Sequence, residues 1–144
     1  MKLVDAYPVV VTDRLQQCRD FYRAWFGFEV AFEASWFVLL TNSAERPQSV
    51  AFMTPDHPSS PPSPPAYDGA GTFLTLQVGD ARAEYERVVS AGLVCALPLT
   101  DEPWGQRRFG VIDPAGMWVD VVEQIDPQPG WWDPYLENGR GERI

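Results

Sequence analysis

The chain predicts an α+β fold in which one unit, a strand followed by a helix and three more strands, occurs twice. Three observations support this prediction. Apolar and turn residues follow the same order in both halves, the interval between corresponding residues is nearly constant, and a proline-rich stretch at residues 54–71 separates the halves. Each half is too small to bury a sheet face alone, so we expect the two to pair across a shared sheet within one structural domain.

The first half contains every element of this unit. Residues 6–12 are rich in β-branched side chains and predict a strand, and Asp13 is placed to cap a helix that ends at Gly27. Apolar side chains recur at helical spacing within that helix, namely Leu15, Cys18, Tyr22, Trp25 and Phe26. Further strands are expected at residues 28–33, 36–40 and 49–53. Residues 1–53 are therefore the first predicted module.

The second half follows a linker at 54–71, whose prolines exclude a helix or a ladder strand and predict a stiff extended segment. Asp80 is placed to cap a second helix, which Gly92 closes. The turn Asp113-Pro114-Ala115-Gly116 predicts a hairpin between the last two strands. Strands are expected at residues 72–78, 94–97, 109–112 and 117–122. The second module then spans 72–124, and an aromatic tail spans 125–144.

The interval between the two halves supports a true repeat. Asp13 and Asp80 are 67 residues apart, and Gly27 and Gly92 are 65 apart. Coincidence is the alternative interpretation, because a strand, a cap, a helix and a glycine often follow one another. The agreement extends over a whole half, which favours a duplicated unit.

Composition restricts the partners. The net charge is −9, so the surface repels nucleic acid and anionic membranes but accommodates a cationic ligand. No stretch approaches the roughly 20 apolar residues that a membrane span needs, and no signal peptide is recognisable. Two cysteines make no disulfide framework. We expect a cytoplasmic protein that binds neither nucleic acid nor membrane.

A family resemblance follows from an ordered set of short motifs. They are Val11-Thr12-Asp13, Phe21-Tyr22, Phe26-Gly27-Phe28, Asp80, Tyr85-Glu86, Ala91-Gly92-Leu93, Gly105-Gln106-Arg107-Arg108-Phe109 and Asp113-Pro114-Ala115-Gly116. With this set, residues 5–124 resemble the vicinal oxygen chelate superfamily, the group of glyoxalase I, the bleomycin-resistance proteins and the extradiol dioxygenases. The resemblance implies two paired βαβββ modules whose curled mixed sheets form a cup with the helices outside. It also implies a homodimer with the cups near the interface.

The resemblance further implies where a metal would bind. Metal-dependent members place His, then His, Gln or Glu, then Glu at positions that match Tyr7, Phe73 and Asp120 of this chain. Tyr7 and Phe73 cannot replace two imidazoles, and His57, the single histidine, lies in the linker. We therefore expect a member that lacks the metal ligands, with no metal and no other cofactor.

Strand alternation predicts what lines the cup instead. If Asp120 faces inward, Trp118 does too, and by the same parity so do Tyr7, Phe73 and Thr75. Asp120 needs a partner, for which Arg108 is preferred to Arg107. Each aromatic residue could equally be core, and the Asp120 pair could be purely structural. The predicted ligand-binding residues are Tyr7, Trp36, Phe73, Thr75, Arg108, Trp118 and Asp120.

Several functions remain open at this point. The first is a small-molecule-binding protein that sequesters an aromatic or cationic compound, as in the antibiotic-resistance branch of the family. The second is a metal-independent isomerase or lyase with Asp120 as the base and Tyr7 as the acid. A shifted register would leave a metal-dependent glyoxalase or dioxygenase-type enzyme, and a catalytically empty domain retained for dimerisation or regulation is a further alternative. We favour binding over catalysis. The tail holds Trp131, Trp132, Tyr135 and Leu136, and we expect it to dock on its own domain or on a dimer partner, with a lid over the cup as the alternative.

Overall fold

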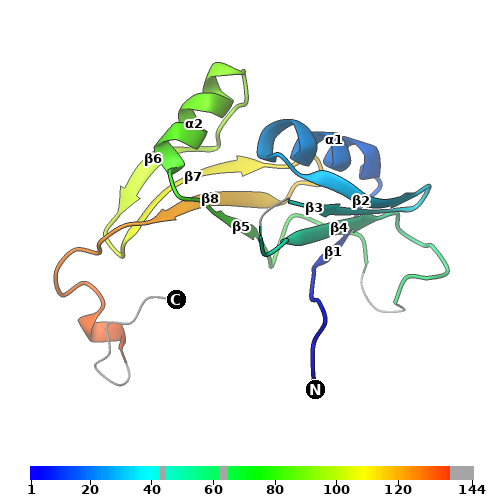
Figure 1. Ribbon diagram of the computed structural model, residues 1–144, viewed down its shortest axis with the longest axis horizontal. Helices are drawn as coiled ribbons and strands as arrows, with labels where there is room; N and C mark the ends of the chain where they lie inside the picture. Colours follow the sequence, from blue (N-terminus) through cyan, green and yellow to red (C-terminus); the bar gives the residue numbers. More distant parts are fainter. Residues whose placement is uncertain (43–44, 62–64, 137–144) are drawn as a thin grey trace. The chain divides into compact units, whose positions relative to one another are not determined.

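The computed structural model describes residues 1–42, 45–61 and 65–136, and its elements follow the order strand, helix and three strands twice (Figure 1). The first module comprises β1 (Val9–Val11), α1 (Leu15–Phe26), β2 (Glu29–Ala34), β3 (Phe37–Thr41) and β4 (Ser49–Met53). The second comprises β5 (Leu74–Gln77), α2 (Ala81–Ser90), β6 (Leu97–Glu102), β7 (Gln106–Ile112) and β8 (Trp118–Gln124). The prediction of two βαβββ modules is confirmed.

Each module forms its own four-stranded mixed sheet, in the orders β1-β4-β3-β2 and β5-β8-β7-β6. The first strand of each module runs parallel to the last, and the other pairs are antiparallel. The expected shared sheet is wrong, because among the described residues no ladder joins the two modules. The β1 edge of the first sheet contacts the linker, because the backbone N–H of Tyr67 donates to the Val11 carbonyl at 2.8 Å.

Each helix packs on one face of the sheet in its own module. In the first module, the Tyr22 ring of α1 lies 5.3 Å from the ring of Phe52 in β4. In the second, Tyr85 of α2 lies 5.4 Å from Phe109 of β7. Because side chains alternate along a strand, the neighbours of Phe52 and Phe109 point to the opposite face. We call the face turned away from the helix of the same module the distal face.

Three of the four helix ends predicted from the sequence are confirmed. Gly27 ends α1 with a φ of 68°, a left-handed conformation that favours glycine, and Asp80 accepts from the Ala83 N–H at 3.0 Å to cap α2. Gly92 follows α2 with a φ of 96°. The prediction that Asp13 caps α1 is wrong. The helix begins one residue later, after Arg14, whose N–H donates instead to the Thr12 hydroxyl at 3.1 Å.

The β7–β8 hairpin forms as predicted, with the Gly116 N–H donating to the Asp113 carbonyl at 2.9 Å. Its turn, Asp113–Met117, belongs to the compact unit that contains residues 1–72, while residues 73–112 and 118–144 form the second unit. The Asp113 carboxylate is buried and accepts from the Tyr22 hydroxyl at 2.7 Å. Burial raises the pKa of Asp113, and the hydrogen bonds from Tyr22 and the turn amides offset part of that shift.

Two strand predictions were displaced. The first strand covers only Val9–Val11 rather than residues 6–12, and the strand expected at 94–97 lies instead at Leu97–Glu102. Residues 94–97 have the apolar character of a strand. The start of β6 is nevertheless set by its pairing, because β6 is an edge strand that aligns with β7 from Leu97 onward. Its ladder is irregular between Leu97 and Thr100, around Pro98, which has no N–H to donate.

The linker is not simply an extended spacer. His57 stacks on Trp36, with ring centroids 3.8 Å apart and an interplanar angle of 8°, and the Ser60 N–H donates to the His57 carbonyl. Together with the Tyr67–Val11 hydrogen bond, these contacts hold residues on both sides of the prolines against the first module. Pro62, Ser63 and Pro64 lie outside the described residues.

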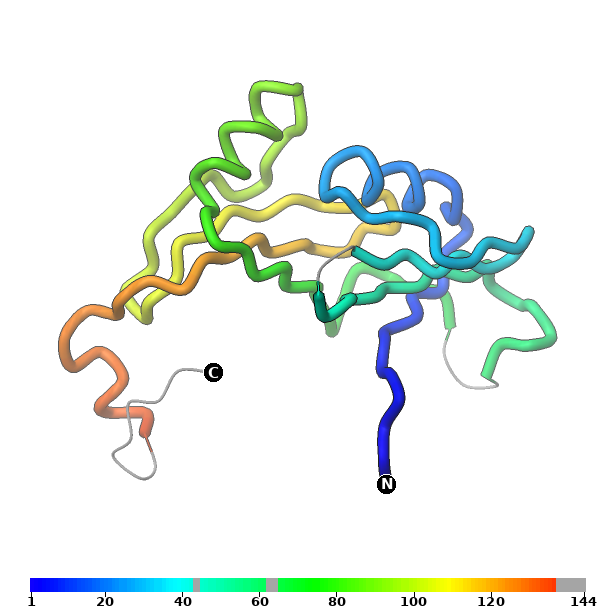
Figure 2. The backbone as a smooth tube through the Cα atoms, in the orientation of Figure 1, coloured from blue at the N-terminus to red at the C-terminus, as the bar shows by residue number. Residues whose placement is uncertain are grey.

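The two ends of the described chain differ (Figure 2). Residues 1–8 run away from β1, with Leu3 69% and Val4 fully exposed. By contrast, the segment 125–136 docks on its own unit, where Trp132 Nε1 donates to the Trp104 carbonyl at 2.8 Å. The expectation that the tail docks is thus confirmed for Trp131, Trp132 and Tyr135, while residues 137–144 lie outside the described part. No helix in the described residues is long and apolar enough to cross a membrane.

Candidate functional site

The distal face of the second sheet brings most of the predicted site residues together. Opposite partners across its strands are Thr75 and Asp120, Gly110 and Asp120, and Ile112 and Trp118. Arg108 lies one step further along β7, on the same face, next to Val122. Val119 and Val121, which alternate with these residues, are buried on the side of α2, as the predicted parity requires.

Asp120 is the centre of this face. It is only 3% exposed, although it is a charged residue and lies on the sheet face turned away from α2. Its Oδ1 accepts from Trp118 Nε1 at 2.8 Å, and its Oδ2 accepts from Arg108 Nη1 at 3.1 Å. A buried carboxylate is tolerated when its oxygens are hydrogen-bonded and its charge is paired, and Asp120 meets both conditions. The structure therefore contains the predicted ion pair, with Arg108 and not Arg107 as the partner, since Arg107 pairs with Asp101 and Glu123.

Arg108 connects Asp120 to a second acidic group and to an aromatic ring. Its Nη2 lies 3.1 Å from the Glu102 carboxylate, and its guanidinium carbon lies 5.0 Å above the Trp104 ring. Two carboxylates thus share one guanidinium, and the cluster carries one excess negative charge. A site with this balance favours a cationic ligand over an anionic one.

A glycine makes room for the Trp118 ring. A Cβ built on Gly110 would lie 2.1 Å from Trp118 Cζ2, far inside contact distance. The indole therefore lies directly over the Gly110 backbone, and this position lets its N–H reach Asp120. The sequence Phe109-Gly110-Val111 has no turn signal, so the glycine serves close packing and not backbone bending.

The remaining predicted site residues are found in different environments. Phe73 and Thr75 are exposed in the second unit, Phe73 to 60%. Phe73 directly precedes β5, and alternation continued from Thr75 would put it on the distal face. Tyr7 and Trp36 belong to the first unit. Tyr7 is 43% exposed, and one face of the Trp36 ring is covered by His57.

The residues at the metal positions of the family do not fit a metal ion. Phe73 has no donor atom, and both oxygens of Asp120 already accept hydrogen bonds. Arg108 Nη1 already lies against Oδ2 at 3.1 Å, so a metal ion coordinated by this oxygen would have to displace the guanidinium. Within residues 1–42, 45–61 and 65–136, no group of three or more His, Cys, Asp and Glu side chains could hold a metal.

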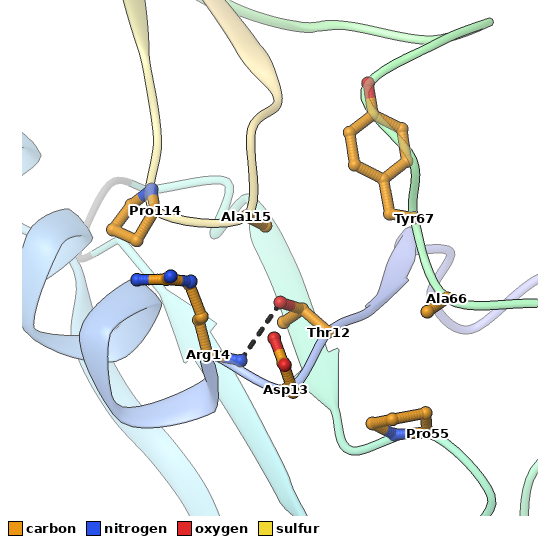
Figure 3. A pocket seen from close by; sticks show the side chains of 8 residues that line it. All are labelled: Thr12, Asp13, Arg14, Pro55, Ala66, Tyr67, Pro114 and Ala115. Carbon is orange, nitrogen blue, oxygen red and sulfur yellow. Dashed lines mark hydrogen bonds between the residues drawn. The ribbon is translucent and has the colours of Figure 1, made fainter.

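The first unit contains a cavity of about 310 Å³ that the sequence did not reveal (Figure 3). Four separate segments of the chain line it: Thr12 to Arg14, Pro55, Ala66 with Tyr67, and the hairpin turn at Pro114 and Ala115. The Tyr67–Val11 and Tyr22–Asp113 hydrogen bonds bring these segments together. The Tyr67 hydroxyl donates to the Thr72 carbonyl, so the cavity wall is held at that end.

The sequence did not predict two of the side chains that contact Arg108, namely Glu102 and Trp104. The signal available was the run of charges between Asp101 and Arg108, which pair across β6 and β7 once the register is known. The strand prediction at 94–97 placed β6 too early and hid that register. The cavity offered no local signal, because its walls come from four separate stretches of sequence.

Comparisons with known proteins agree with this architecture. Residues 6–121 match the family described as "Glyoxalase/Bleomycin resistance protein/Dioxygenase superfamily". Among curated proteins, none matches this chain.

Solved structures resemble the chain over most of its length. One is a glyoxalase/bleomycin resistance protein/dioxygenase from Nocardioides, at 17% identity and a TM-score of 0.70, covering 90% of this chain and 89% of that one. TioX from Micromonospora sp. ML1 matches at 20% identity and a TM-score of 0.64, covering 84% and 100%. Lactoylglutathione lyase from Agrobacterium tumefaciens matches at 22% and 0.59, covering 85% and 96%. At these identities the structures show a shared fold. With the family match over residues 6–121, the chain belongs to the glyoxalase/bleomycin resistance protein/dioxygenase superfamily.

Proposed function

We propose that the protein binds a small planar aromatic cation on the distal face of the second sheet, without a metal ion. The observation that carries this proposal is the Asp120–Arg108–Glu102 cluster, which has one excess negative charge among aromatic rings. Small-molecule sites combine aromatic walls with a few placed polar groups, and the excess charge selects a cation. The net charge of −9 for the whole chain acts in the same direction by attracting cations over longer range.

Phe73 supplies the most accessible ring on this face. It is 60% exposed, and exposing a large apolar side chain is unfavourable unless something covers it. A flat ligand stacked on Phe73 and Trp118 would cover that ring and place its charge near the carboxylates. The name bleomycin resistance in the matching family, which implies capture of an organic compound by some members, supports this choice of function.

The geometry favours binding over base catalysis. A general base must lie within reach of the substrate proton, whereas Asp120 is only 3% exposed and is held by hydrogen bonds from Trp118 and Arg108. A substrate would reach this carboxylate only if one of these side chains moved. Asp120 therefore acts in this proposal as a fixed charge and an anchor for the two side chains around it.

The test is calorimetric titration with proflavine, a planar aromatic cation, against naphthalene-2-sulfonate, a planar aromatic anion. The proposal predicts saturable binding of proflavine only, and a rise in melting temperature that grows with its concentration, because binding to the native state stabilises it. Phe73→Ala should weaken proflavine binding about tenfold, as loss of a stacking ring worth about 1.4 kcal/mol does.

Phe32→Ala is the matched control. Phe32 is also a largely exposed phenylalanine, at 56%, on the distal face of the first sheet, where no guanidinium–carboxylate cluster is found among the described residues. Its loss should leave proflavine binding unchanged. Equal binding of the anion and the cation, or equal effects of the two substitutions, would contradict the proposed site.

A further inference from the structure

The C-terminal segment 125–136 is fixed to the β6–β7 turn by several directed bonds. The Ile125 N–H donates to the Gly105 carbonyl and the Gln128 N–H to the Pro103 carbonyl, each at 2.9 Å. Gly105 has a φ of 106°, and a Cβ there would lie 2.8 Å from the Ile125 carbonyl oxygen, so the turn and the segment approach as closely as their backbones allow. This segment is a built part of the second unit.

Aromatic side chains of the segment also pack against the β6–β7 turn. Trp131 lies at its centre, with its ring centroid 5.8 Å from Trp104, 4.8 Å from Trp132 and 5.1 Å from Tyr135. Trp132 also donates its indole N–H to the Trp104 carbonyl. Both the backbone and the ring of Trp104 are therefore held by residues of the segment.

Trp104 in turn contacts Arg108. The guanidinium lies over the indole ring at 5.0 Å, and the same guanidinium forms the ion pairs with Asp120 and Glu102. The Arg108 Nε–H is buried and has no hydrogen-bond partner within the described chain. An arginine side chain has many rotamers, so a packed ring beside it decides which of them is populated. The negative face of the indole is the neighbour that best tolerates an unpaired donor there.

From these contacts we infer that segment 125–136 is a positioning element of the ligand site, with Trp131 holding Trp104, and Trp104 holding Arg108 against Asp120. This inference rests on the proposed binding function, because it makes the tail part of that site. It assigns the aromatic residues after β8 a role in ligand affinity that acts through Trp104.

The experiment follows the Arg108 Nε–H by NMR in protein labelled with ¹⁵N-arginine, the signal being assigned by its loss in Arg108→Lys. Trp131→Ala should speed exchange of this proton with water about fivefold or more, because the guanidinium samples further rotamers once Trp104 is loose. Arg107, the residue before it, is an internal control, since its Nε donates to Asp101 on the neighbouring strand. Its exchange should not change.

Two further variants separate positioning from general damage. Trp131→Phe keeps a ring against Trp104 and should restore slow exchange. Tyr135→Ala removes a ring of the same segment that is 65% exposed and touches Trp131 rather than Trp104, and it should change exchange much less. Unchanged Arg108 exchange in Trp131→Ala would overturn the inference whatever the ligand result.

Proflavine titration of the same variants tests the link to binding. Trp131→Ala should weaken proflavine about fivefold, the effect of losing a cation–π-supported contact, and Trp131→Phe should recover it. Faster Arg108 exchange with unchanged proflavine affinity would overturn the claim that the segment belongs to the ligand site. If the wild type binds no proflavine but Arg108 exchange still responds, the proposed ligand fails while the positioning of Arg108 stands.

Discussion

The two modules share one backbone plan but differ at every matching position of the distal face. Where the first sheet has Val9, Ala51 and Leu39 side by side, the second has Thr75, Asp120 and Gly110. The register also matches Phe37 with Arg108 and Ser49 with Trp118. The first sheet therefore has two apolar side chains, Ala51 and Phe37, where the second has the Asp120–Arg108 ion pair.

This difference shows that the polar cluster is a property of side chains and not of the fold. The ion pair needs all of its parts at once: a carboxylate on β8, a guanidinium one step along β7, and a glycine between them that admits the Trp118 ring. The first module has none of these in the matching places, although its strands pair in the same way. A ligand that needs charge would therefore distinguish the two sheets.

The largest expected effect comes from placing one part of the cluster in the wrong module. Ala51 is completely buried, and Ala51→Asp would put there a carboxylate whose register neighbours are Val9 and Leu39. A buried charge without a partner costs about 4 kcal/mol of unfolding free energy. Urea denaturation measures this change in the free energy of unfolding. A decrease of less than about 1 kcal/mol would show that the first sheet accommodates a buried charge as the second does.

Removing the space for Trp118 should have the next largest effect. Gly110→Ala forces a Cβ to within 2.1 Å of the indole, so the ring must leave Asp120. Overpacking of this kind costs about 3 kcal/mol. Gly79→Ala is the control, because a Cβ there meets nothing within 4 Å, and it should be neutral in the same denaturation assay. Equal stability of the two variants would mean that Trp118 is not held where the structure places it.

The strength of the ion pair is expected to be moderate. In a double-mutant cycle, Asp120→Asn with Arg108→Gln should give a coupling energy of about 1.5 kcal/mol, because the Asp120 side chain is only 4% exposed while Arg108 is 27% exposed. The reference cycle is Asp101→Asn with Arg107→Gln, whose carboxylate is 54% exposed and whose coupling should stay below about 0.5 kcal/mol. Equal coupling energies would contradict the claim that the buried Asp120–Arg108 pair is stronger than the exposed Asp101–Arg107 pair.

The smallest effect concerns pH, in the first unit. Burial raises the pKa of Asp113 in the folded state, so the native protein holds this proton more tightly than the unfolded chain does. Its contribution is therefore favourable at low pH and is lost as pH rises from the ordinary carboxyl pKa through the raised folded value. Asp113→Asn should flatten the dependence of unfolding free energy on pH in that window.

Tyr22→Phe tests the titration of Asp113 by removing its hydrogen-bond donor. It removes a hydrogen bond that lowers the Asp113 pKa, so the loss of stability should extend to higher pH. Denaturation curves between about pH 4 and pH 8 cover the window in which a raised carboxyl pKa acts. If Tyr22→Phe moves that window to lower pH, the assignment of the titration to Asp113 is wrong.

Much of the fold could be predicted because its signals are local. The cap at Asp80, the stop at Gly27 and the hairpin turn at Asp113–Gly116 each depend on a few neighbouring residues, and all three are present. Asp13 failed as a cap because Thr12, one residue earlier, accepts the hydrogen bond of the incoming backbone. The early strand at 94–97 failed because pairing with β7, and not local propensity, sets where β6 begins.

The site was only partly predictable for the same reason. Parity along β8 was enough to put Trp118 and Asp120 on one face, and charge alone suggested an arginine partner. Glu102 and Trp104 depend on the register between β6 and β7, which no local pattern fixes. Whether any of the seven predicted site residues contacts a ligand stays a prediction, as does the homodimer.

The most direct measurement is a chemical-shift map of ¹⁵N-labelled protein titrated with proflavine. The shifted amides should cluster in β5, β7 and β8 around Thr75, Gly110 and Asp120, together with the indole signals of Trp118 and Trp104. The matching amides of Val9, Leu39 and Ala51 should stay in place. Shifts centred on β1, β3 and β4, with the second sheet unchanged, would contradict the claim that the polar distal face is the binding site.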